Sequence, residues 1–293
     1  MSQFTALLAT ARPRQWIKNS IIFAGLIFSK HLFNLPDLFA VTEAFLIFCL
    51  VTSCIYIFND LVDIKQDLNH PKKRLRPLPS GQLHPTVAKI ALGFLLFLSL
   101  TLAYLLSYNY FVIVLFYFAL MISYTLWLKN VVILDAFIIA AGFVLRGVAG
   151  MEVINVKMSP WFLICASLLA LFIVFCKRRH ELVILGDEAV THRLILAEYK
   201  QVFLDQLISI VTSAIIVSYS LYTIAPETIV NFHSQNLIYT IPVIIFCLFR
   251  YLYLVYRKNE GGNAELLVFS DGTLFFSIGL WFVMILMIIY YHF

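Results

Sequence analysis

The stretch FNDLVDIKQDLNHPKKRLRPLPSG, residues 58–81, is rich in charged residues and lies between two long apolar segments. Three aspartates, Asp60, Asp63 and Asp67, come at its start, and the cations are Lys65, Lys72, Lys73, Arg74 and Arg76. On a helix that continues from the preceding apolar segment, spacings of three and four residues place the three carboxylates along one face. Three adjacent negative charges repel one another, so the pattern predicts a positively charged partner at this point.

The composition of the whole chain predicts a membrane protein. Of its 293 residues 62% are hydrophobic and 13% charged, whereas soluble domains are about 45–50% apolar and about 25% charged. A spanning helix needs about 20 mostly apolar residues, and nine segments meet this requirement: 19–35, 38–58, 86–106, 110–128, 131–150, 159–176, 202–224, 236–256 and 270–292. We therefore expect an all-α, polytopic bundle of nine transmembrane helices that forms a single domain over residues 1–293.

The distribution of Lys and Arg predicts the orientation of this bundle. Only Lys30 and Lys157 fall on one side, while the connections on the other side hold nearly all the remaining cations. Positively charged connections stay in the cytoplasm, so we expect a protein of the inner (cytoplasmic) membrane with its N-terminus in the cytoplasm and its C-terminus outside. The net charge of +5 is then a consequence of topology and of contact with the lipid bilayer, and we expect no nucleic-acid partner. The sequence leaves the formation of a homo-oligomer open.

The residue types at the aspartates predict a magnesium site. Asn59, Asp60, Asp63 and Asp67 offer only oxygen ligands, without Cys or His, and such ligands suit a hard cation that also bridges to substrate phosphates. The alternative is a solvated helix end with no ligand. Because Asp67 lies furthest into the loop, it is expected to matter least of the three aspartates.

The residues from Asn59 to Gly81 resemble the first aspartate motif, NDxxDxxxD, and the following loop of the UbiA superfamily of intramembrane prenyltransferases. Within that superfamily the chain is most similar to the decaprenyl-phosphate phosphoribosyltransferase branch, in the stretches RPRQWIKN (12–19), YTLWLKNVVILDAFIIAAGFVLRGVAG (124–150), KRRHEL (177–182), HRLILAEY (192–199) and AELLVFSDGTL (264–274). The resemblance implies a UbiA-type bundle whose cavity opens to the cytoplasm. It also implies Mg²⁺ as cofactor and Asp60, Asp63 and Asp67 as catalytic residues.

The loop after the sixth predicted span departs from the superfamily pattern. Ordinary members carry a second DxxxD motif there, whereas residues 177–199 read KRRHELVILGDEAVTHRLILAEY, in which cations dominate and Asp187 and Glu188 are only adjacent. The branch implies transfer of a phosphoribosyl group from 5-phosphoribosyl diphosphate to a polyprenyl phosphate, with release of diphosphate, to make a cell-wall precursor. Two alternatives stay open: a prenyltransferase that moves a prenyl group from a prenyl diphosphate to an aromatic or other acceptor, and a lipid binder or transporter without chemistry.

The candidate substrate-binding residues are basic or polar groups near the predicted cytoplasmic face: Lys18, Arg74, Arg76, Tyr124, Lys129, Asp135, Lys177, Arg178, Arg179 and Arg193. Arginine and lysine at these places fit phosphate groups. Lys129 could equally be a snorkelling residue, and Lys177, Arg178 and Arg179 a positively charged anchor of the helix. The sequence does not decide whether Arg146 and Arg250, which lie within predicted spans, are structural or functional.

Overall fold

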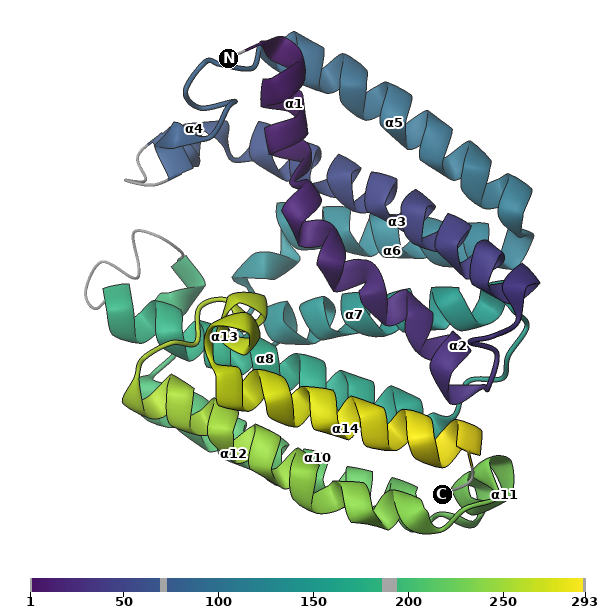
Figure 1. The fold of residues 1–293 in the computed structure, drawn as a ribbon. Helices are drawn as coiled ribbons and strands as arrows, with labels where there is room; N and C mark the ends of the chain where they lie inside the picture. The colour runs from purple at the N-terminus through teal and green to yellow at the C-terminus, as the bar shows by residue number, and fades with distance from the viewer. Residues whose placement is uncertain (1, 69–72, 186–193, 292–293) are drawn as a thin grey trace. The chain divides into compact units, whose positions relative to one another are not determined.

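The computed structural model describes residues 2–68, 73–185 and 194–291, and the regular elements in these ranges are all helical (Figure 1). The chain divides into two compact units, which are described separately below. Unit 1 comprises residues 1–129 and 142–157, and unit 2 comprises residues 130–141 and 158–293. The single domain expected from the sequence stays a prediction.

Unit 1 is arranged around one long helix, α3, which packs against α1, η1, α5 and α6. Its elements are α1 (Gln3–Ala11), η1 (Pro13–Phe23), α2 (Ala24–Phe28), α3 (Leu35–Val62), α4 (Ile64–Leu68), η2 (Lys73–Leu75), α5 (Pro85–Leu106), α6 (Tyr108–Leu126) and η3 (Leu128–Asn130), which ends one residue into unit 2. Helix α7 (Leu134–Val153) begins in unit 2, and its residues from 142 onward belong to unit 1.

Local sequence explains where these helices begin and end. Helix α1 stops at Arg12, which has left-handed backbone angles (φ 54°) and precedes a proline, and the residue before proline disfavours the helical region. Helix α3 starts after Asn34, whose side chain accepts the N–H of Asp37. Helix α5 starts with Pro85, after His84 accepts the N–H of Thr86 through Nδ1. These caps satisfy N–H groups that have no partner within the helix.

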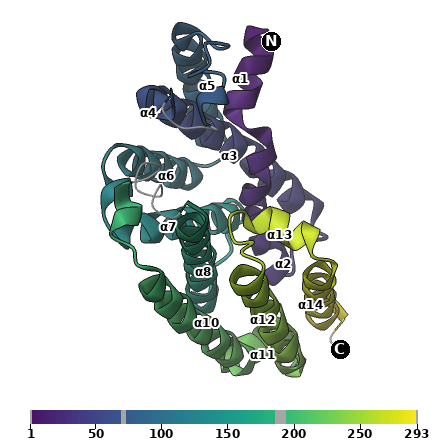
Figure 2. The same ribbon diagram turned by 90° about the vertical axis from the view of Figure 1, so that its left-hand side faces the viewer.

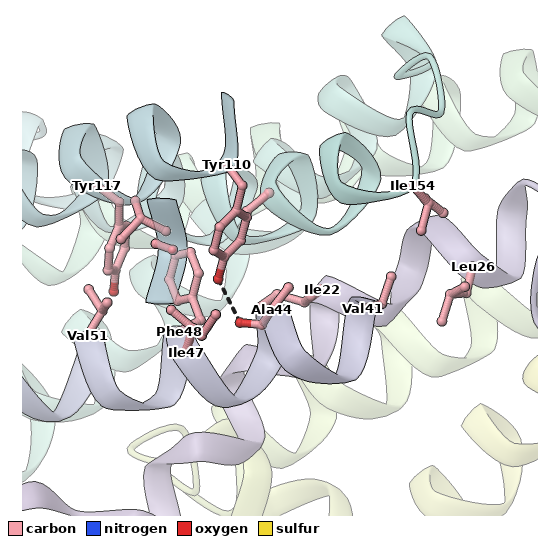
Figure 3. Packing of buried hydrophobic residues seen from close by; sticks show 13 residues of the cluster. Ile22, Leu26, Val41, Ala44, Ile47, Phe48, Val51, Tyr110, Tyr117 and Ile154 are labelled. Carbon is pink, nitrogen blue, oxygen red and sulfur yellow. Dashed lines mark hydrogen bonds between the residues drawn. The ribbon is translucent and has the colours of Figure 1, made fainter. Parts of the chain in front are cut away.

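The core of unit 1 lies between α3, α6 and the N-terminal segment (Figure 3). Phe48 and Tyr117 pack with ring centroids 4.7 Å apart. The hydroxyl of the fully buried Tyr110 donates to the carbonyl of Ala44 at 2.7 Å, so its one polar atom is satisfied inside the apolar cluster. A buried hydroxyl without such a partner would be costly in an apolar environment.

The first predicted span, 19–35, is not one long helix. The chain forms η1 and then the short α2, and it turns before Asn34. This segment lies directly against α7, since a Cβ atom added at Gly150 would be 2.0 Å from the carbonyl oxygen of Ile22. Within the described ranges eight helices are long and apolar enough to cross a membrane, and they match the other eight predicted spans.

Unit 2 is a set of long helices in which α8 packs on α10, α10 on α12, and α12 on α14 (Figure 2). Its elements are α8 (Pro160–Leu185), η5 (Leu194–Ala197), α10 (Gln201–Ile224), α11 (Pro226–Phe232), η6 (Asn236–Thr240), α12 (Ile241–Arg257), α13 (Ala264–Ser270) and α14 (Gly272–Tyr291).

Arg250 has a structural partner in unit 2. Its guanidinium donates to both carboxylate oxygens of Asp271, at 3.1 and 2.8 Å, and Asp271 also accepts the N–H of Leu274 in the first turn of α14. This pair joins α12 to the start of α14, so the structure gives Arg250 a role in packing.

Candidate functional site

The acidic cluster (Asp60, Asp63 and Asp67) lies where α3 ends and α4 begins. The N–H of Asp63 donates to the carbonyl of Asn59 at 2.9 Å, and the N–H of Asp67 donates to that of Asp63 at 2.8 Å. These two hydrogen bonds span the break at Asp63, so the aspartates lie on two successive helices and not on the one uninterrupted helix expected from the spacing.

Two of the three carboxylates converge on one cation. Nη1 of Arg76 donates to Oδ1 of Asp60 at 3.1 Å and to Oδ2 of Asp67 at 2.6 Å. The side chains of both aspartates are only 2% exposed. Lys73 lies 3.8 Å from Asp67 and adds a second positive charge there.

Arg76 is held at this place by the loop that follows η2. The loop turns at residues 76–81, where Gly81 has left-handed angles (φ 76°) that a glycine adopts without strain. Leu78 and Leu83 anchor it, because their buried side chains pack with Ala6 and Ile57 in a small apolar cluster. The loop therefore has a fixed position against α1 and α3, and its arginine reaches the end of α3.

Arg12 is a second cation on Asp60. Its Nη2 lies 2.5 Å from Oδ1 of Asp60, and its guanidinium stacks over the ring of Tyr56 at 4.9 Å. The same N-terminal segment contacts α3 twice more. Trp16 donates to Ser53 at 3.0 Å, and the amide of Asn19 donates to Thr52 at 3.2 Å.

Lys129 forms an ion pair with the third carboxylate, that of Asp63. It lies in η3, after the end of α6, and its Nζ is 2.9 Å from Oδ1 of Asp63. Asp63 is 19% exposed, against 2% for the other two aspartates. A lysine that only snorkelled to the interface would not need this carboxylate, so the contact favours a role at the acidic cluster.

The donor set of the acidic cluster fits a hard divalent cation. In the described part of the chain no three acidic, His or Cys side chains converge on one point, but Asp60 and Asp67 already share one positive group. Carboxylate oxygens are the ligands that Mg²⁺ prefers. Asp60 and Asp67 could therefore hold the ion, with Asn59 and Asp63 as the neighbouring oxygen donors.

A second charged cluster lies in unit 2 and contains two of the predicted substrate-binding residues. Asp135 is fully buried at the start of α7, and Nε of Arg178 donates to its Oδ2 at 3.0 Å. The hydroxyl of Tyr199 donates to Oδ1 of Asp135 at 2.8 Å and accepts the N–H of Ile133. Burial, and then the bond to Asp135, raises the pKa of Tyr199, whose hydroxyl already keeps its proton at neutral pH at the ordinary tyrosine value. Arg178 also contacts Glu181 at 2.8 Å.

The three basic residues at the end of α8 have different surroundings. Arg178 and Arg179 are buried, and Arg179 pairs with Asp205 at 2.6 Å and stacks on Tyr256. The exposed Lys177 lies 4.0 Å from Glu181. Because both arginines are buried and Lys177 is exposed, Lys177 is the most accessible of the three to a phosphate.

Four predicted substrate-binding residues remain: Lys18, Arg74, Tyr124 and Arg193. Lys18 in η1 and Tyr124 in α6 are half-buried, and Arg74 in η2 is exposed. Arg193, Asp187 and Glu188 lie outside the described residues. The candidate site residues selected from the sequence did not include Arg12, Glu181 or Tyr199. Two of these lie in stretches that carry the family resemblance, Arg12 in RPRQWIKN and Tyr199 in HRLILAEY.

Comparisons with known proteins agree with this architecture. Residues 20–280 match the UbiA prenyltransferase family. The chain is 31% identical to decaprenyl-phosphate phosphoribosyltransferase of Mycolicibacterium smegmatis over 76% of this chain and 71% of that protein. It is 30% identical to the Corynebacterium glutamicum protein of the same name, over 74% and 66% respectively. Its fold resembles that of a UbiA homologue from Archaeoglobus fulgidus solved with GPP and Mg²⁺, with a TM-score of 0.71, 18% identity, and coverage of 96% of this chain and 99% of that one.

Proposed function

Because the chain belongs to the UbiA prenyltransferase family, we propose that this multi-pass membrane transferase moves a 5-phosphoribosyl group from phosphoribosyl diphosphate to a polyprenyl phosphate. The observation that carries the proposal is its similarity, at about 30% identity, to proteins named for that reaction. The basic loop 177–199, which lacks the second paired aspartate motif, supports it. A phosphoribosyl donor brings an additional phosphate and the acceptor lipid another, so a site for both needs cations more than carboxylates.

In the proposed reaction the bond between the ribose C1 and the diphosphate oxygen breaks, and diphosphate leaves with the electron pair. A phosphate oxygen of the lipid forms the new bond to C1. The lipid phosphate is already anionic, so no general base is required. Catalysis therefore consists mainly of positioning the two anions and stabilising the charge on the leaving group.

The chain's own residues divide this work. Asp60 and Asp67, with Asn59 and Asp63, are the proposed ligands of Mg²⁺, which would neutralise charge on the diphosphate when bound. Arg76 and Lys129, which lie beside these carboxylates, are proposed to bind phosphate oxygens. Lys18, Arg74, Tyr124, Lys177 and Arg193 stay candidates for the remaining phosphate contacts. Asp135, Arg178 and Arg179 are proposed to support their helix ends through their buried ion pairs.

A test with two donor and acceptor pairs separates this function from its closest alternative. Purified protein with Mg²⁺ is expected to transfer label from radiolabelled phosphoribosyl diphosphate to a polyprenyl phosphate, and excess chelator is expected to stop the transfer. The alternative, a prenyltransferase, is favoured by the family's name and by the prenyl diphosphate in the A. fulgidus structure. Turnover of a prenyl diphosphate with an aromatic acceptor, and none of the ribose donor, would establish that alternative. Binding of both lipids without turnover would favour a lipid binder.

We also propose the topology that the positive charges predict. Residues 13–28 would form the ninth membrane segment, with the N-terminus in the cytoplasm and the C-terminus outside the inner membrane. Reporters fused after Phe293 are then expected to give an outside signal, and those inserted near Lys73 an inside signal. A cytoplasmic signal at Phe293 would mean that an even number of segments crosses the membrane.

A further inference from the structure

The acidic cluster is already neutralised by cations of unit 1. Among the described residues its three carboxylates contact four cations. Arg12 and Arg76 contact Asp60, and Arg76 and Lys73 contact Asp67. Lys129 contacts Asp63. A free divalent cation would therefore add two positive charges to a group in which the cations already outnumber the carboxylates, which Coulomb repulsion opposes.

The two arginines also cover the carboxylates. The side chains of Arg12 and Arg76 are 26% exposed, whereas those of Asp60 and Asp67 are 2% exposed. The guanidinium groups thus lie on the accessible side of the acids. Since Nη1 of Arg76 contacts both Asp60 and Asp67, an ion bound by both aspartates would take the place of this group.

We infer that Arg12 and Arg76 are exchangeable counter-ions of the acidic cluster, which release its carboxylates to a divalent cation when a diphosphate arrives to bind the guanidinium groups. The inference deepens the proposed function, on which it rests for the presence of a diphosphate in the site. Diphosphate oxygens are suitable new partners, because arginine forms paired, charge-assisted hydrogen bonds with phosphate. In the exchanged state each carboxylate and each guanidinium again has an opposite charge beside it.

This exchange makes the metal and the diphosphate bind together. The diphosphate binds the guanidinium groups that repel the metal, and the metal binds the carboxylates that repel the diphosphate. By thermodynamic linkage each ligand therefore raises the affinity of the protein for the other by the same factor. Arg76 therefore has opposite effects on the two ligands. It weakens the binding of the cation alone and strengthens the binding of the diphosphate.

The test measures both affinities on the full-length protein in detergent. Binding of Mn²⁺ without phosphate is followed by electron paramagnetic resonance, and binding of radiolabelled pyrophosphate is followed at saturating Mg²⁺. In Arg76→Gln we expect Mn²⁺ to bind about tenfold more tightly and pyrophosphate about tenfold more weakly than in the wild type. Arg12→Gln should show the same crossed pattern to a smaller degree, because Arg12 contacts only one of the two buried aspartates.

The matched control is Arg14→Gln, which removes the same charge from an exposed position two residues away from Arg12 and should change neither affinity. Arg76→Lys keeps the charge and should restore most of the wild-type behaviour. If Arg76→Gln weakens both ligands, Arg76 merely supports the fold of the site and the inference is wrong. It is equally wrong if the wild type and the variant bind Mn²⁺ alike. The Mn²⁺ measurement contains no phosphate, and the second measurement uses pyrophosphate, which the two donor types have in common. A failure of the phosphoribosyl assay would therefore leave this result unaffected.

Discussion

Replacing Asp60 by Asn is expected to lower Mg²⁺-dependent transfer by about a hundredfold or more while the protein stays folded. The amide has the same shape and retains an acceptor oxygen for Arg12 and Arg76, but it loses the negative charge that a metal ligand needs here. Both arginines are partly exposed, so water can solvate them when the carboxylate is gone. The rate is measured with saturating donor and acceptor, and folding by size-exclusion chromatography and thermal unfolding.

The structure changes the order expected among the other two aspartates. The position of Asp67 in the sequence predicts the smallest loss of activity for Asp67→Asn. In the structure, however, Asp67 is as buried as Asp60 and contacts the same Arg76. Asp67→Asn is therefore expected to approach Asp60→Asn in effect, and Asp63→Asn, at the more exposed contact with Lys129, to be the mildest. Glu260→Gln, at an exposed position after α12, is the control. Full activity of Asp60→Asn, or turnover in excess chelator, would rule out the metal site.

Replacing Arg146 by Met is expected to destabilise the protein by roughly 2–5 kcal/mol, because several buried groups lose their hydrogen-bond donor. Arg146 is buried in α7, where it donates to Asn19 Oδ1 at 2.8 Å, to the carbonyl of Gly142 at 2.8 Å and to the hydroxyl of Tyr117 at 2.6 Å. Its guanidinium also lies 4.9 Å from the centroid of the Tyr117 ring. Methionine fills similar space but leaves buried acceptors without their donor, and an unsatisfied buried polar group costs about 1–3 kcal/mol.

Thermal unfolding in detergent, followed by fluorescence-detected chromatography, measures this effect. Arg257→Met removes an exposed arginine at the end of α12 and should change stability by less than about 0.5 kcal/mol. The loss of stability in Arg146→Lys should lie between those of Arg146→Met and Arg257→Met, because lysine keeps the charge but cannot donate in three fixed directions. An unchanged melting temperature in Arg146→Met would show that this network does not hold η1, α6 and α7 together.

The eight long helices could be predicted from the sequence, because the lipid environment leaves the backbone few conformations. An apolar segment of sufficient length must satisfy its own hydrogen bonds as a helix when it crosses a membrane. The helices of the described ranges accordingly follow the predicted spans within a few residues at most ends. The first span is the exception. Its backbone approaches α7 so closely at Gly150 that packing, rather than hydrophobic length, determines its conformation.

The sequence by itself determined the all-helical membrane fold and the grouping of Asp60, Asp63 and Asp67, because both depend on composition and on short spacings along one helix. Only the tertiary structure decided which cation meets which carboxylate. Arg12 and Asp60 are 48 positions apart, and Lys129 and Asp63 are 66 apart. Such contacts depend on how helices pack, and in an apolar chain the lipid-facing and core-facing positions are both hydrophobic, so the sequence does not indicate which faces meet. The sequence likewise does not indicate the partners of Arg146. Asn19 and Tyr117 become its neighbours only when three separate segments are packed together.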